Sequence, residues 1–162
     1  MEYPVLFEKC IKVVFKNEGG YCWNKLDPGG ETNMGICKKY YPDEDIKNLT
    51  KERAKEIYYW DYWEPMHLEG IYNQNLMLQV FDMGVNAGIK RSARILQKIV
   101  GAWRDGIIGQ KTKFLVNTYK GDLLDDFKQA RADYYVSLVD KNPSMRVFLK
   151  GWLQRIDNTF LI

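Results

Sequence analysis

Apolar residues recur at helical spacing along nearly the whole chain, and this periodicity constrains the fold more than any other feature. Turn signals interrupt it at Gly19-Gly20, Gly88, Gly101, Asp105-Gly106, Gly121 and Asn142-Pro143. The intervening segments predict helices over 5–18, 33–40, 51–63, 74–87, 90–100, 110–119, 122–139 and 144–157. No stretch alternates strongly enough for a central strand, and a small hairpin within 21–37 is the one β alternative. The predicted fold class is therefore all-α or nearly so.

Size and charge narrow the class of protein. The 162 residues, 46% of them hydrophobic, suffice for one compact domain with a sizeable core. The 24 basic and 21 acidic residues are interspersed and leave a net charge of only +3, so nucleic acid is not an expected partner. No apolar segment is long enough to span a bilayer, and residues 1–8 do not resemble a signal peptide. We expect a chain made in the cytoplasm, without stable membrane insertion.

Cysteine and histidine are too sparse for a metal or disulfide framework. Cys10, Cys22 and Cys37 form no C-x-x-C pair, and His67 is the only histidine. Reduced thiols are favoured over a Cys22–Cys37 bridge, because proteins that are not secreted seldom keep disulfides. We expect neither a metal nor a cofactor.

Two carboxylic acids and a threonine surround the glycine-rich stretch that follows the first predicted helix. Glu18 falls on the last turn of that helix, where the helix dipole and partial burial both favour the neutral acid. A neutral acid can give its proton to a glycosidic oxygen, Asp27 could act as the second carboxylate, and Thr32 could hold a water. Each residue also has a structural alternative: Glu18 as a solvated helix end, Asp27 as part of a turn, and Thr32 as a helix N-cap.

Two runs of the sequence together resemble the signature of glycoside hydrolase family 108, the N-acetylmuramidases of phages and bacteria. They are Glu18-Gly19-Gly20-Tyr21 and Asp27-Pro28-Gly29-Gly30-Glu31-Thr32-Asn33-Met34-Gly35-Ile36. Further blocks that resemble the family follow in order: residues 58–65, 81–88, 96–97 with 105–112, and 151–155. The resemblance implies one lysozyme-like helical domain over 1–162, with a muramidase catalytic region (1–88) and a C-terminal helical peptidoglycan-associated region (89–162) packed on it. Cys37 and Gln110 stand where the family often has Thr and Pro.

The resemblance also implies an activity, namely cleavage of the β-1,4 bond between N-acetylmuramic acid and N-acetylglucosamine in peptidoglycan glycan strands. Glu18 matches the catalytic glutamate of the family. The order Glu18, Asp27, Thr32 is similar to the catalytic trio of phage-type lysozymes. Whether the reaction retains or inverts the anomeric configuration depends on the distance between the two carboxyl groups.

Four further residues are candidates for substrate binding, because sugar sites pair aromatic faces with polar side chains. Tyr21 lies beside the predicted acid, and Trp63 belongs to an aromatic helix stripe that could equally be core. Asp82 and Asn86 are one turn apart on an otherwise apolar helix, so they either bond to each other and to a neighbouring loop or point into a cleft.

Two alternatives to a muramidase stay open. A lytic transglycosylase uses one glutamate and leaves an anhydro product, and a peptidoglycan-binding or secretion-accessory protein would hold glycan without cutting it. Glu18 together with Asp27 and Thr32 favours hydrolysis. The lack of a signal peptide predicts an endolysin of prophage origin that acts on the cell wall after release.

Overall fold

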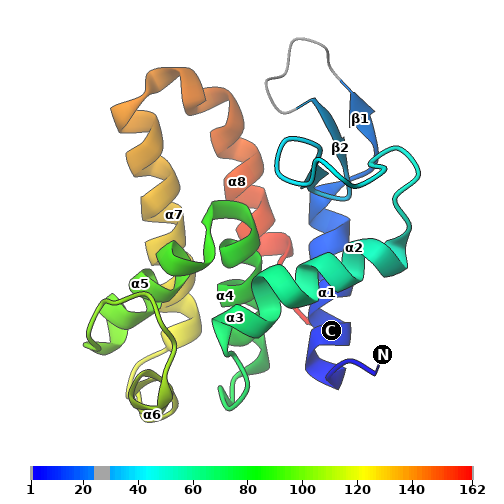
Figure 1. Ribbon diagram of the computed structural model, residues 1–162. Coiled ribbons are helices and arrows are strands. Elements are labelled where there is room, and N and C mark those ends of the chain that lie inside the picture. Colours follow the sequence, from blue (N-terminus) through cyan, green and yellow to red (C-terminus); the bar gives the residue numbers. More distant parts are fainter. Residues whose placement is uncertain (1, 24–29, 162) are drawn as a thin grey trace. The chain divides into compact units, whose positions relative to one another are not determined.

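The computed structural model describes residues 2–23 and 30–161, so Asp27 lies outside the described residues. The chain forms two compact units, Met1–Asp61 and Tyr62–Ile162, called here the N-terminal and C-terminal units. Helices dominate both units, and the strands belong to one small antiparallel sheet (Figure 1). The nearly all-α prediction is thus confirmed. Within the described part of the chain, no helix is both long and apolar enough to cross a membrane.

The N-terminal unit is built on helix α1 (Val5–Glu18), which buries Phe7, Cys10, Ile11 and Val14 along one face. The spacing of three or four residues between these side chains is what the periodicity predicted. The helix ends at Gly19, whose φ of 76° favours glycine. Glu18 is therefore the last helical residue, as the sequence indicated.

Three short strands follow α1: β1 (Cys22–Trp23), β2 (Glu31–Asn33) and β3 (Ile36–Cys37). They pair antiparallel in the order β1-β2-β3. The helix expected over 33–40 is wrong, and the alternative of a small hairpin within 21–37 is confirmed, because β2 and β3 form a hairpin there. Asn33 pairs with Ile36, and Met34 and Gly35 both take positive φ, as a two-residue hairpin turn requires.

Helix α2 (Lys51–Tyr58) completes the N-terminal unit and begins where the sequence predicted. The Thr50 side chain accepts a hydrogen bond from the Arg53 N–H at 3.1 Å, which is an N-cap. The helical path continues through the π-helix η1 (Tyr59–Trp63) and the short α3 (Glu64–Met66). Tyr59 packs edge-on against Phe7 and against Tyr3, at centroid distances of 5.1 and 5.0 Å.

The C-terminal unit is organised around α4 (Gln74–Ala87), which is buried without a break from Leu76 to Gly84. Helices α5 (Ile89–Val100) and α7 (Leu123–Lys141) both pack on α4. In Figure 1, α7 and α8 (Arg146–Asn158) run side by side, joined by the 3-10 turn η2 (Pro143–Met145). Helix α6 (Gln110–Asn117) packs on α5. These helices lie where the turn signals predicted them.

Candidate active site

The Glu18 carboxylate lies against the β2–β3 turn. A Cβ built on Gly35 would be 2.6 Å from Glu18 Oε2 and would also collide with the Tyr58 hydroxyl. Gly35 has a φ of 78°, so glycine is required there both by the backbone conformation and by space. The half-buried acid at the end of α1 is thereby brought into close contact with the hairpin backbone.

Tyr58 fixes the same turn from the side of α2. Its hydroxyl donates to the Met34 carbonyl oxygen at 2.8 Å, and its ring, only 1% exposed, meets Phe15 edge-on. Tyr58 and Gly35 were not among the predicted site residues. Both stand in the blocks that resemble the family, so that resemblance was the available signal.

Thr32 lies in the middle strand of the sheet, where it pairs with Cys22 on one side and Cys37 on the other. It is part-buried and comes two residues before the turn that meets Glu18. The alternative role as a helix N-cap is wrong, because Thr32 stands in a strand and no helix follows it directly. A role for Thr32 in holding water, and any role for Asp27, stay predictions.

Tyr21 presents part of its ring to solvent, at 42% exposure. Its hydroxyl donates to Glu31 Oε1 at 2.9 Å, which ties the start of β1 to the start of β2. Desolvation and this bond to Glu31 raise the pKa of the Tyr21 phenol, so the hydroxyl keeps its proton at neutral pH. An exposed, anchored ring of this kind is suited to stacking on a sugar.

A pocket of about 590 Å³ begins at Gly19 and Gly20, the two residues after Glu18, and extends between α1 and α2. Its apolar lining consists of Ile11, Phe15 and Met34. Its polar lining consists of Glu8, Lys12, Lys16, Lys51, Glu52 and Lys55. Apolar walls with a polar rim are typical of ligand sites. The space beside Gly19 and Gly20 is open, because a Cβ built on either glycine has no atom within 4 Å.

Trp63 belongs to the C-terminal unit and is fully buried. Its indole N–H donates to Glu69 Oε1 at 2.6 Å, and its ring packs edge-on against Phe81 at a centroid distance of 5.1 Å. These contacts are those of a core residue, and the ring has no exposed face. Substrate stacking by Trp63 stays a prediction that this packing does not support.

Asp82 is fully buried and bound by two arginines. Arg131 donates from Nη2 at 2.6 Å, and Arg155 donates from Nε and Nη2 at 2.9 and 2.8 Å. Burial by itself would raise the pKa of the Asp82 carboxyl, but hydrogen bonds and charge from Arg155 and Arg131 outweigh it and hold the pKa below its usual range. The first of the two alternatives predicted for Asp82 therefore holds only in part: Asp82 bonds to neighbouring side chains, but these two arginines lie on helices α7 and α8 and not in a loop.

Asn86 joins the same network through Tyr135, whose hydroxyl donates to Asn86 Oδ1 at 2.6 Å. Tyr135 in turn accepts from Arg131 Nε at 3.2 Å, and Gln79 accepts from Arg131 Nη1 at 2.9 Å. The network therefore connects α4 with α7, and Arg155 extends it to α8. Substrate binding by Asp82 and Asn86 stays a prediction, for which these side chains would have to exchange their present partners.

Cys10, Cys22 and Cys37 are thiols and not part of disulfides. Cys10 is buried in the α1 face, and this burial raises the pKa of its thiol to about 12. Over residues 2–23 and 30–161, no group of three or more His, Cys, Asp or Glu side chains could hold a metal ion.

Comparisons with known proteins identify the family of the chain. The family model described as Glycosyl hydrolase 108 matches residues 11–88, and the model described as Predicted Peptidoglycan domain matches residues 91–157. The solved structure titled "Structure of Brucella abortus SagA" is 30% identical, with a TM-score of 0.78 over 94% of this chain and 90% of that chain. No curated protein gives a significant match.

Proposed function

The chain belongs to the glycosyl hydrolase 108 family, and on that premise we propose that it is a muramidase with Glu18 as its general acid. Membership in the family makes the chain a glycoside hydrolase, and the match over 91–157 makes peptidoglycan its substrate polymer. The bond proposed for cleavage is the β-1,4 bond between N-acetylmuramic acid and N-acetylglucosamine.

The reaction begins with proton transfer from the Glu18 carboxyl group to the glycosidic oxygen, which breaks the bond to the leaving sugar. The ring that remains carries oxocarbenium-like positive charge. Asp27 either stabilises this charge or activates a water, and Thr32 positions that water through its hydroxyl. Water then supplies the new hydroxyl group, and Glu18 is reprotonated.

The observation that carries this proposal is the contact of the Glu18 carboxylate with the backbone of Gly35. A surface glutamate at a helix end needs no such arrangement, whereas here a glycine at φ 78° and a buried tyrosine hydroxyl are both fitted around the acid. A carboxyl group held in this way has a fixed position relative to a substrate, which general acid catalysis requires.

The pocket that starts at Gly19 and Gly20 is the proposed saccharide site in the N-terminal unit. Phe15 and Met34 offer apolar surface to sugar ring faces, and Lys12 and Lys16 offer hydrogen-bond donors to hydroxyl and acetamido oxygens. Tyr21, three residues after Glu18 in the sequence, adds an exposed ring on which a sugar could stack.

The bond and the reaction type are tested by mass spectrometry of the products from purified peptidoglycan. We expect the wild type to release fragments with reducible N-acetylmuramic acid ends. Glu18→Gln should release none, whereas the exposed control Glu2→Gln should match the wild type.

Other products would decide against the proposal. Anhydro ends would make the protein a lytic transglycosylase, and reducible N-acetylglucosamine ends would place the cut at the other glycosidic bond. Glycan that is bound but left intact by the wild type would favour a binding or secretion-accessory protein.

We also propose that the protein is an endolysin, which acts on the cell wall after its release from the cytoplasm. A gene that lies beside phage lysis genes would support it. Efficient export of the native chain by a secretion machinery would contradict it.

A further inference from the structure

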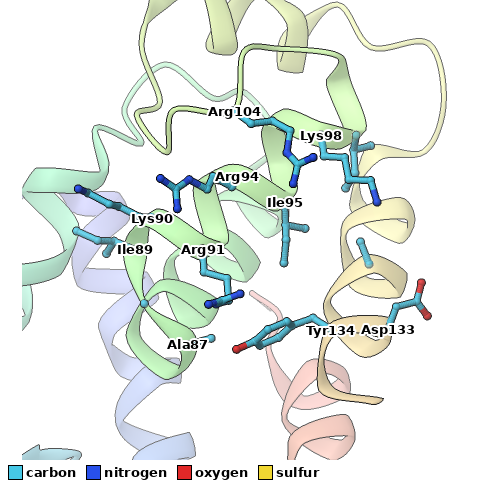
Figure 2. Close-up of a pocket in the computed structure, with 13 residues that line it drawn as sticks. Ala87, Ile89, Lys90, Arg91, Arg94, Ile95, Lys98, Arg104, Asp133 and Tyr134 are labelled. Atoms are coloured by element: carbon cyan, nitrogen blue, oxygen red, sulfur yellow. The ribbon is translucent and has the colours of Figure 1, made fainter. Parts of the chain in front are cut away.

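A second pocket, of about 840 Å³, lies in the C-terminal unit between α5 and α7, and five of its thirteen lining residues are cations (Figure 2). The basic residues around it are Lys90, Arg91, Arg94, Lys98 and Arg104. Asp133 is the one acidic residue in its lining, and its carboxylate accepts from Gln129 at 2.8 Å. Within the described part of the chain, none of the five cations forms an ion pair with a carboxylate.

The pocket follows from the sequence of α5. Lys90, Arg94 and Lys98 are spaced by four residues and form one stripe, while Ser92, Ala93, Leu96 and Gln97 are buried on the opposite side. Like charges four residues apart on a helix repel one another. Solvent and the Asp105 carboxylate offset part of this repulsion, and a bound anion would offset more of it.

Apolar groups form the rest of the lining, so the pocket suits more than a bare anion. Ile95 lies at the centre of the view in Figure 2, and Ile99 and Ala130 also contribute to the wall. The Arg91 guanidinium lies over the Tyr134 ring at 4.9 Å from its centroid. A ligand that fills this pocket should carry several negative charges interspersed with small apolar groups.

Arg94 and Arg104 also line a neighbouring hollow of about 440 Å³, together with Ala102 and Trp103. The Trp103 side chain is 82% exposed, which leaves an indole face free to stack on a sugar. The two hollows share two arginines, so a sugar at Trp103 and an acidic group in the larger pocket could belong to one ligand.

Buried Gln97 holds the loop that carries Trp103 and Arg104. Its amide donates to Asp105 Oδ1 at 2.7 Å and to the Ile107 carbonyl at 2.9 Å, and its oxygen accepts from the Gly106 N–H at 2.9 Å. The hydrogen bonds from Gln97 and from the Ile107 N–H, with a smaller contribution from the charge of Arg94, lower the pKa of the Asp105 carboxyl. The loop is therefore positioned before any ligand binds.

We propose that the pocket between α5 and α7 binds the stem peptide of peptidoglycan, an acidic peptide whose carboxylates alternate with small aliphatic side chains, while the attached sugar stacks on Trp103. The planar forks of Arg94 and Arg104 bind carboxylates, and Ile95 and Ile99 contact the alanyl methyl groups. This assignment rests on the proposed function, since it takes peptidoglycan as the substrate. On this assignment, the C-terminal unit recognises mainly the stem peptide and not the glycan.

The test is calorimetric titration of the full chain with a soluble stem tetrapeptide. The variant Arg94→Gln/Lys98→Gln removes two cations from the pocket. The control Arg146→Gln/Lys150→Gln removes the same residue types at the same spacing from exposed positions of α8. We expect the pocket variant to weaken binding by at least about tenfold, since charge-assisted hydrogen bonds are lost, and the control to leave it unchanged.

A tetrapeptide with its carboxylates amidated should not bind. Equal affinity in both double variants, or binding of the amidated peptide, would overturn the proposal. Two further probes are vesicles that contain phosphatidylglycerol and a soluble glycerol phosphate polymer. If either probe binds and the tetrapeptide does not, the proposal is overturned in favour of a phosphate ligand.

Cleavage of glycan strands stripped of their peptides separates this proposal from the proposed function. The wild type should cut stripped strands, because the proposed muramidase activity acts on the glycan and does not need the peptide. Tetrapeptide binding without cleavage of any glycan would mean that the proposed muramidase activity fails while the peptide site stands. Cleavage without tetrapeptide binding would mean the reverse.

Discussion

Gly35 is the residue on which the position of the Glu18 carboxylate depends. It takes a φ of 78° in the hairpin turn, and the acid occupies the space where any Cβ would stand. Gly30 offers a natural comparison, because it has a similar φ of 72° with nothing within 4 Å of a built Cβ. The two glycines share a backbone requirement, but only Gly35 is also constrained by the site.

Gly35→Ala should therefore cost more than Gly30→Ala. Positive φ alone should destabilise each variant by about 1 kcal/mol, and the collision should add about 1–3 kcal/mol at Gly35. The shift of Glu18 should lower the rate of peptidoglycan hydrolysis by about tenfold or more in Gly35→Ala alone. Chemical denaturation and dye-release kinetics measure both effects. Similar losses in the two variants would mean that the collision is relieved without moving the acid.

At the scale of the element, helix boundaries could be predicted because each has a local signal. Gly19 and Thr50 mark the end of α1 and the start of α2 in the sequence as in the structure. The β2–β3 hairpin was predicted only as an alternative to a helix, because its local signal is weaker: a non-glycine residue, Met34, takes positive φ in its turn. The partners of Asp82 were out of reach, since Arg131 and Arg155 lie 49 and 73 residues away along the chain.

The candidate active site likewise has one part that local sequence signals predict and another that depends on tertiary packing. Glu18 stands at a helix end with a local signal, whereas its contact with Gly35 and the bond from Tyr58 to Met34 depend on how separate elements pack. Periodicity places each of these residues on an element but does not say which elements meet.

The interaction of Asp82 with Arg131 and Arg155 should hold α4, α7 and α8 together. Asp82→Asn should lower the free energy of unfolding by about 3–5 kcal/mol, because two guanidinium groups lose their shared countercharge. Asp140→Asn, an exposed carboxylate on α7, is the control and should change it little. A loss below about 1 kcal/mol in Asp82→Asn would show that the arginines find other partners.

The network also predicts a dependence on pH. The folded pKa of Asp82 lies below its ordinary value of 3.8, so its stabilisation is complete above that value and is lost as the pH falls through the lower folded pKa. The unfolding free energy of the wild type should therefore decline more steeply below about pH 4 than that of Asp82→Asn. Parallel acid profiles of the two proteins would contradict this.

At the scale of the whole molecule, a net charge of +3 is small, but its distribution is uneven. Five cations gather around the pocket between α5 and α7. If they meet carboxylates of the wall polymer, retention of the inactive Glu18→Gln variant on purified peptidoglycan should fall severalfold between about 0.05 and about 0.5 M salt, because exposed charges are screened. Arg94→Gln/Lys98→Gln on the same background should show a weaker dependence. Retention that does not change with salt would mean that wall binding is not electrostatic.

The central claim is that Glu18 gives the proton that breaks the glycosidic bond, and the rate of peptidoglycan hydrolysis by Glu18→Gln tests it most directly. The amide keeps the size of the carboxyl but has no acidic proton, so folding and wall binding should be unchanged. The rate should fall by at least about 100-fold, while Glu2→Gln should match the wild type. A folded Glu18→Gln protein that hydrolyses peptidoglycan within about threefold of the wild-type rate would contradict the account, since a lost general acid costs far more than that.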